Sequence, residues 1–179
     1  TGVHQGDNLA PLLFILVFQA AMESLQLSSE CKEISKPKYK YFPNTKTNKP
    51  RSRLTSQNPS AKGTAFTHWL SLYVDDSAFI LPTREDATKT ANLTLNHLKQ
   101  FGLQMHTGNI DKKSKTEVLF VPKRSEQNKP TDLSPIILSN GTQITYTERF
   151  TYLGLVIASD LSDDPDITLR TVSYTHLRA

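Results

Sequence analysis

The sequence predicts an α+β fold in which helices pack on an antiparallel sheet. Two segments carry apolar residues at helical spacing, and several short segments rich in aromatic and β-branched residues alternate with turn residues. No segment repeats, so a solenoid is excluded. A chain of 179 residues is long enough for one domain with a core and too short for two.

The two predicted helices cover residues 9–27 and 83–101. The first tolerates Pro11 because proline fits the first turn of a helix. The second begins at a capping-box pattern formed by Thr83 and Asp86, and Gly102 supplies its stop. Its apolar positions recur at helical spacing: Ala87, Ala91, Leu95, Leu98 and Phe101.

Strands are expected where short apolar runs lie between turn signals. The segments 65–73 and 78–81 flank an Asp-Asp pair and form a hairpin candidate. Further strands are predicted at 117–121, 136–138, 144–146 and 150–158, with a turn at 139–142 and a loop at 123–134.

The composition excludes several classes of protein. The single cysteine, Cys31, rules out an intrachain disulfide framework and a cysteine-based zinc cluster, which favours a reducing intracellular setting, nuclear or cytoplasmic and not secreted. The longest apolar run, residues 9–18, contains Pro11 and is shorter than the roughly 18 residues that span a bilayer. No membrane partner is therefore expected.

Residues 28–63 form a basic segment without apolar periodicity. They hold nine Lys or Arg against two Glu, a net charge of +7, whereas the whole chain carries +4 and the remainder therefore −3. Prolines and polar residues predict a flexible insertion. Its cations could follow a nucleic-acid backbone and Tyr39 could stack on bases, but a solvated linker is the ordinary reading of such a composition.

Asp75 and Asp76 stand together on the expected turn between two apolar strands. Adjacent negative charges repel, and a bound cation relieves that repulsion. Magnesium takes oxygen ligands from one or two carboxylates plus substrate phosphates, and a pair of ions can hold an in-line phosphoryl transfer. Asp75 is the expected direct ligand and Asp76 its neighbour. An Asp-Asp dipeptide alone is far more often a solvated turn than a metal site.

The surrounding residues strengthen the metal interpretation. Tyr73-Val74-Asp75-Asp76 resembles the signature of reverse transcriptases, an aromatic residue and a small residue before two aspartates. The segment 1–14 resembles the preceding block of non-LTR retrotransposon and group II intron enzymes. Segments 101–105 with 115–118, and 150–154, resemble the two blocks that follow. Four blocks in the family's order cover residues 1–170.

The resemblance implies an incomplete right-hand polymerase palm that extends a DNA primer on an RNA template. It implies deoxynucleoside triphosphates as substrates and two Mg²⁺ ions as cofactors, with Mn²⁺ as a substitute. Asp75 and Asp76 would hold metal. The residues expected at template, primer or nucleotide are Gln5, Gly6, Tyr73, Tyr152, Leu153 and Gly154.

Several of these residues have a purely structural alternative. Gln5 and Gly6 open the first helix, where Asp7 or Asn8 would serve as its cap. Residues 150–158 resemble a primer-gripping hairpin, and an ordinary core hairpin fits them as well. Lys115 aligns with a lysine that approaches the triphosphate as a catalytic group, yet it also belongs to a solvated charge run.

The resemblance also says what the chain lacks. It places another metal-binding aspartate upstream of Gln5, together with the fingers, most of the thumb and any endonuclease, so these missing parts of the polypeptide are expected partners. We expect the isolated chain not to polymerise. A catalytically dead nucleic-acid-binding remnant of a retroelement is the alternative, and an unrelated α+β interaction domain is a third. Residues 171–179 are left unassigned because 173–179 resemble translated cloning adaptor.

Overall fold

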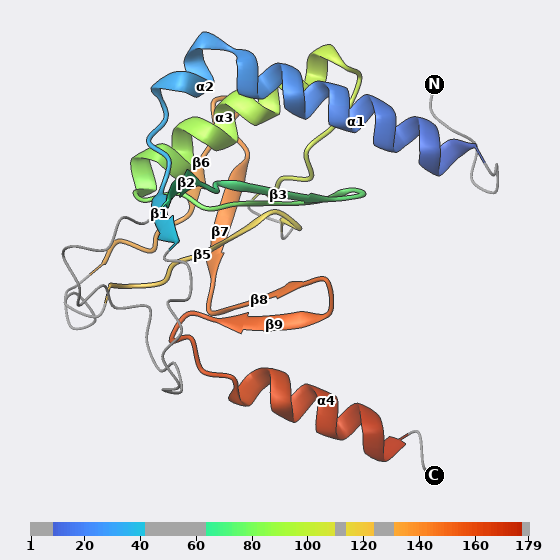
Figure 1. Ribbon diagram of the computed structural model, residues 1–179, viewed down its shortest axis with the longest axis vertical. Helices are drawn as coiled ribbons and strands as arrows, with labels where there is room; N and C mark the ends of the chain where they lie inside the picture. The colour runs from blue at the N-terminus through green and yellow to red at the C-terminus, as the bar shows by residue number, and fades with distance from the viewer. Residues whose placement is uncertain (1–8, 42–63, 110–113, 124–130, 177–179) are drawn as a thin grey trace.

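The computed structural model describes residues 9–41, 64–109, 114–123 and 131–176. Three helices lie together at one end of the molecule, small sheets occupy the middle, and a last helix lies at the other end (Figure 1). In chain order the elements are α1 (Ala10–Leu27), α2 (Ser29–Glu33), β1 (Lys38–Tyr41), β2 (Thr64–Thr67), β3 (Leu70–Tyr73), β4 (Asp76–Phe79), α3 (Arg84–Gln100), β5 (Glu117–Leu119), β6 (Ile136–Ile137), β7 (Gln143–Thr147), β8 (Arg149–Tyr152), β9 (Leu155–Ala158) and α4 (Asp164–His176).

Helix α1 confirms the first helix prediction. Leu9 is its N-cap and makes no side-chain cap hydrogen bond, and the predicted caps Asp7 and Asn8 lie outside the described residues. The carboxy-terminal half of α1 packs into the main apolar core. That core consists of Phe18, Ala21, Met22, Leu25 and Leu98, with Phe14, Leu70, Phe79, Leu93, Leu103 and Met105 against it.

Helix α3 confirms the capping-box prediction. The hydroxyl of Thr83 accepts a hydrogen bond from the Asp86 backbone N–H and donates to the Asp86 carboxylate, at 3.0 and 2.6 Å. After the helix, Gly102 adopts a φ of 71°, the left-handed conformation that glycine tolerates best. One stripe of α3 packs on the core of α1. Leu95, on another stripe, packs on the buried strand residues Ile136, Leu138 and Ile144.

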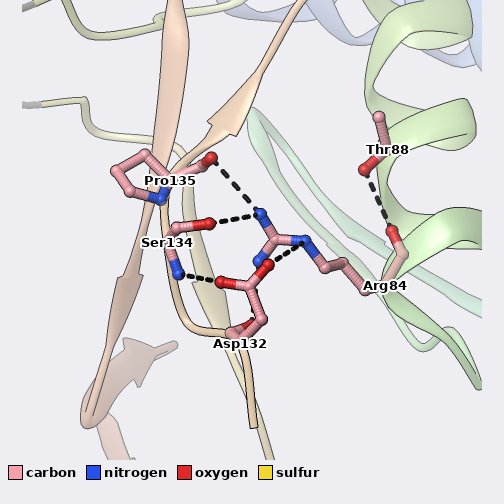
Figure 2. A network of polar contacts seen from close by, with 5 residues as sticks. All are labelled: Arg84, Thr88, Asp132, Ser134 and Pro135. Atoms are coloured by element: carbon pink, nitrogen blue, oxygen red, sulfur yellow. Dashed lines mark hydrogen bonds and ion pairs between the residues drawn. The ribbon is translucent and has the colours of Figure 1, made fainter.

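Arg84, at the start of α3, attaches the loop before β6 to the helix (Figure 2). Its guanidinium donates to the backbone oxygen of Asp132 at 3.0 Å and to the Ser134 hydroxyl at 3.1 Å, and forms an ion pair of 3.7 Å with the Asp132 carboxylate. Hydrogen bonds from the Ser134 side chain and backbone, and then the charge of Arg84, hold the pKa of Asp132 below its ordinary value. The described part of the predicted loop, residues 123 and 131–134, contains no helix or strand.

The strands differ from the predicted antiparallel sheet. They form separate hairpins, β1–β2, β3–β4 and β8–β9, and a three-stranded sheet of order β5-β7-β6. In that sheet β5 pairs with β7 in parallel and β6 with β7 antiparallel. The predicted turn at 139–142 is present, where the Leu138 backbone N–H donates to the Thr142 oxygen at 2.8 Å.

Three boundary predictions were wrong. The segment 65–73 is two strands, interrupted at His68 and Trp69, and 150–158 is a hairpin instead of one strand. The segment 28–63 is not wholly without structure, since it contains α2 and β1; its residues 42–63 lie outside the described part of the chain. The unassigned segment 171–179 includes the end of α4, which reaches His176.

Long-range contacts explain the structure found in the basic segment. Cys31 is fully buried and Ile34 is 5% exposed, although both lie among charged residues in the sequence. The backbone N–H of Ser35 donates to the Asp86 carboxylate at 3.2 Å, so α3 holds the chain just before β1.

Helix α1 is long and apolar enough to cross a membrane by length and composition alone. Its mean hydropathy is 1.5, and 22% of the 18-residue window is buried inside the molecule. Core helices of soluble proteins meet the same criterion, and Met22 and Leu25 of α1 are core residues. The expectation of no membrane partner stays a prediction.

Candidate functional site

The β3–β4 hairpin presents the two aspartates. Its strands pair from Leu70 with Phe79 to Tyr73 with Asp76, which leaves Val74 and Asp75 as a two-residue turn. At the open end of the hairpin, the Ile80 backbone N–H donates to the Trp69 oxygen at 2.8 Å and extends the pairing. The predicted hairpin is thus confirmed, and the aspartates lie at its tip.

The hairpin has an apolar face and a polar face. Residues directly opposite each other on paired strands share a face, so Leu70 lies with Phe79, and both pack against the core formed by α1. The Phe79 ring also contacts that of Trp69, with 5.6 Å between centroids. By the same alternation, Tyr73 and Asp76 lie on the opposite face. The core therefore fixes the hairpin and leaves its second face open.

The tip itself is unusual in its backbone. Val74 has a φ of 54°, in the left-handed region where β-branched residues are genuine outliers. Hairpins with two-residue turns normally place glycine or asparagine at such a position. Strain of this kind costs on the order of 1–3 kcal/mol and clusters at functional sites.

Asp75 and Asp76 are both exposed, and they meet the chemical requirement for a magnesium ligand pair. Their oxygen atoms are free of hydrogen bonds and ion pairs within the described residues, so they are available to a cation. No group of three or more His, Cys, Asp or Glu able to hold a metal occurs in the described ranges. Two carboxylates fit Mg²⁺ in sites where phosphate oxygens and water complete the coordination.

A side-chain hydrogen bond joins a second hairpin, β8–β9, to the polar face of the first. The hydroxyl of Tyr152 donates to the hydroxyl of Ser71 at 3.1 Å, and Ser71 shares its face with Tyr73 and Asp76. Both hairpins extend toward the same side of the molecule (Figure 1). Sequence analysis predicted a role for Tyr152 but not this contact, because 81 positions separate the two residues.

The β8–β9 turn consists of Leu153 and Gly154. Both have positive φ, 50° and 78°, the combination that a type I′ turn requires. Leu153 is exposed, and a Cβ atom at Gly154 would meet nothing within 4 Å. The predicted primer-side residues therefore form an open hairpin tip.

Helix α4 supports this second hairpin through Asp166. The carboxylate of Asp166 accepts from the Val156 backbone N–H at 3.1 Å and from the Arg170 guanidinium at 2.6 Å. The Arg170 bond first, and then the Val156 bond, lower the pKa of Asp166 from its ordinary value. No sequence motif pointed to this attachment.

Lys115 is exposed and lies just before β5. Its backbone N–H donates to Nδ1 of His106 at 3.1 Å, and the neighbouring Ser114, which is buried, donates to the His106 backbone oxygen at 3.1 Å. Among the described residues, no hydrogen bond or ion pair joins the Lys115 ammonium to Asp75 or Asp76. The structure fixes the backbone at Lys115 without bringing its side chain to the aspartates.

The remaining predicted residues, Gln5 and Gly6, lie outside the described part of the chain. Comparison of the chain with protein-family models, with curated proteins and with solved structures finds no match.

Proposed function

We propose that this chain is part of an RNA-directed DNA polymerase of the non-LTR retrotransposon type. The observation that carries the proposal is the exposed Asp75-Asp76 pair on a strained two-residue turn, beside a second hairpin bonded to the same face. Both features are observed independently of the sequence resemblance. The proposed reaction transfers a deoxynucleotide to the 3′ end of a DNA primer on an RNA template.

In this proposal Asp75 and Asp76 act by positioning and by charge. Bound Mg²⁺ would neutralise the phosphates and stabilise the attacking and leaving oxygens. The two carboxylates hold the cation, and the packing of Leu70 and Phe79 on the core fixes the base of the hairpin that carries them. The Leu153-Gly154 turn, tied to Ser71 through Tyr152, is the candidate contact for the primer strand. Exposed Lys115 remains a candidate for the triphosphate, and Gln5 and Gly6 for the template.

A second candidate is a nucleic-acid-binding remnant without polymerase activity. No third acidic ligand joins Asp75 and Asp76 among the residues the structure describes, an arrangement that both candidates share. Membrane attachment has no support beyond the composition of α1, and an intracellular location stays a prediction.

The test is templated DNA synthesis by the full-length polypeptide encoded at the locus. Incorporation of labelled dTTP on a poly(rA) template with an oligo(dT) primer should require Mg²⁺ and should fall by about a thousandfold in Asp75→Ala, because several kcal/mol of transition-state stabilisation are lost. Asp163→Ala is the matched control, an exposed aspartate before α4, and should retain activity. Full activity of Asp75→Ala would refute the metal-ligand role, and an inactive parent would favour the remnant.

A further inference from the structure

The β1–β2 hairpin carries an exposed pair of stacked aromatic rings. Tyr39 and Phe66 are opposite each other in the register, so both side chains lie on one face of the hairpin. Their ring centroids are 5.5 Å apart at an interplanar angle of 27°, and the residues are 37% and 49% exposed. Exposed aromatic rings on a sheet provide a flat surface on which planar groups can stack.

Cations flank this aromatic pair along β1. Lys38 and Lys40 precede and follow Tyr39, and both are exposed. Neither forms an ion pair within the described residues, whereas Lys36 places its ammonium 4.5 Å from the centroid of the Trp69 ring. By strand alternation Lys38 and Lys40 leave from the face opposite Tyr39, and their long side chains can reach around the edge of β1 so that their charge lies near the rings. The hairpin thus combines an apolar planar surface with positive charge.

The β1–β2 hairpin is separate from the carboxylate site. Strand β2 leads through His68 and Trp69 into β3, which then runs to its tip at Asp75. The β1–β2 hairpin therefore lies at one end of the segment formed by β2 and β3, and the tip that carries the carboxylates lies at the other end (Figure 1).

We propose that this hairpin binds single-stranded nucleic acid, with bases stacked on Tyr39 and Phe66 and phosphates at Lys38 and Lys40 along the edge of β1. Base stacking on aromatic rings, supported by cations that follow the backbone, is the general mode of sequence-tolerant single-strand binding. A duplex is a poorer fit, because its base faces are already stacked on each other. The proposal stands on the hairpin's own residues and does not depend on the polymerase proposal.

The test measures binding of the full chain to a fluorescein-labelled oligomer of twelve thymidines by fluorescence anisotropy. An abasic oligomer of equal length carries the same charge without bases. Phe66→Ala should weaken thymidine-oligomer binding by about tenfold and leave abasic-oligomer binding unchanged, as expected for loss of base stacking. Phe101→Ala is the matched control, because Phe101 is also exposed and contacts a ring, that of His97, on another element.

Salt dependence tests the role of the lysines. Replacing Lys38 and Lys40 by glutamine should reduce the slope of log affinity against log salt by about 0.7 for each lysine.

Two outcomes would overturn the proposal. The first is equal affinity for the thymidine and abasic oligomers, which would mean that charge alone accounts for binding. The second is unchanged binding by Phe66→Ala. Emission from the single tryptophan, Trp69, reports whether each variant is folded, because this residue is buried next to Phe79. If Phe66→Ala unfolds, Phe66→Leu is used in its place. Leucine keeps an apolar contact but has no planar face on which a base can stack. Full binding affinity of a folded Phe66→Leu variant would equally refute stacking.

Discussion

The β3–β4 and β8–β9 hairpins have the same strand and turn lengths but chemically different tips. Each pairs two four-residue strands through a two-residue turn. The second uses Leu153 and Gly154, both at positive φ, a conformation that the glycine adopts readily. The first places Val74 at positive φ and follows it with Asp75. Both turns place a non-glycine residue in the left-handed region, Val74 in the first and Leu153 in the second, but only the second follows it with a glycine and only the first carries a β-branched residue next to two aspartates.

The difference indicates that the first tip is not optimised for stability. Valine at a φ of 54° and two adjacent carboxylates each disfavour the folded state. The packing of Leu70 and Phe79 on the core offsets these costs. The second tip also has a residue at positive φ, Leu153, but it carries no carboxylate, and its hairpin is bonded through Tyr152 and Asp166. The two tips should therefore respond differently to cations and to substitution.

The largest expected difference is in metal binding. Mn²⁺ added to the isolated chain should broaden the backbone amide resonances of Asp75 and Asp76 and leave those of Leu153 and Gly154 sharp, because only the first tip carries carboxylates. Asp75→Asn combined with Asp76→Asn should abolish the broadening. Equal broadening at both tips would show that the ion has no preference for the aspartate pair.

The next largest expected effect is the loss of stability when the glycine of the Leu153-Gly154 turn is replaced. Gly154→Ala should lower the free energy of unfolding by about 1–2 kcal/mol, because a Cβ atom disfavours the left-handed conformation. The surroundings add nothing to this cost, since the new Cβ atom meets no atom within 4 Å. Urea unfolding followed by Trp69 emission measures it. Leu153→Gly is the control of opposite sign and should not destabilise the chain by this amount.

Local signals account for the parts of the fold that the sequence predicted well. The ends of α3 are defined by interactions between residues close in the sequence, at Thr83 and Asp86 and at Gly102, so the sequence pattern alone predicts them. The Asp75-Asp76 pair between apolar strands was readable for the same reason.

Contacts between distant residues account for what was missed. Helix α2 lies in a charged segment and is held by burial of Cys31 and by the Ser35 bond to Asp86. The parallel pairing of β5 with β7 joins residues that are far apart in the sequence; Glu117, for example, pairs with Thr145, 28 positions later. The spacing of apolar residues along the chain does not indicate this pairing. The Tyr152–Ser71 bond, which connects the two hairpins, belongs to the same class.

The strain at the first tip gives a prediction of the opposite sign. Val74→Asn should raise the free energy of unfolding by about 1 kcal/mol, because asparagine tolerates the left-handed region far better than valine. The same urea experiment measures the change. Val156→Asn, in the extended strand β9, is the control and should not stabilise the chain. A Val74→Asn variant that is no more stable than the parent would mean that the turn is not strained.

The bond between the hairpins should contribute less. Tyr152→Phe removes the hydroxyl that donates to Ser71 and should cost about 0.5–1.5 kcal/mol, the usual net value of one hydrogen bond. Ser71→Ala should cost a similar amount, and the double variant should cost less than the sum of the two. Additive losses in this cycle would show that the two hydroxyl groups do not interact in solution.

The smallest expected effect is on pH dependence, at the attachment of α4 to the second hairpin. The pKa of Asp166 is lowered in the folded chain by Arg170 and by the Val156 N–H. A carboxyl group with a lowered pKa binds fewer protons in the folded chain than in the unfolded chain. It therefore stabilises the fold at pH values above its ordinary pKa of 3.8, and this contribution is lost as the pH falls through the lower pKa of the folded chain. Asp166→Asn should therefore unfold at a lower urea concentration than the parent at pH 7, and the gap should narrow toward pH 3. Because α4 packs on β9, the Asp75-Asp76 tip should keep its Mn²⁺ response in this variant. A loss of that response would mean that the two hairpins form one cooperative unit.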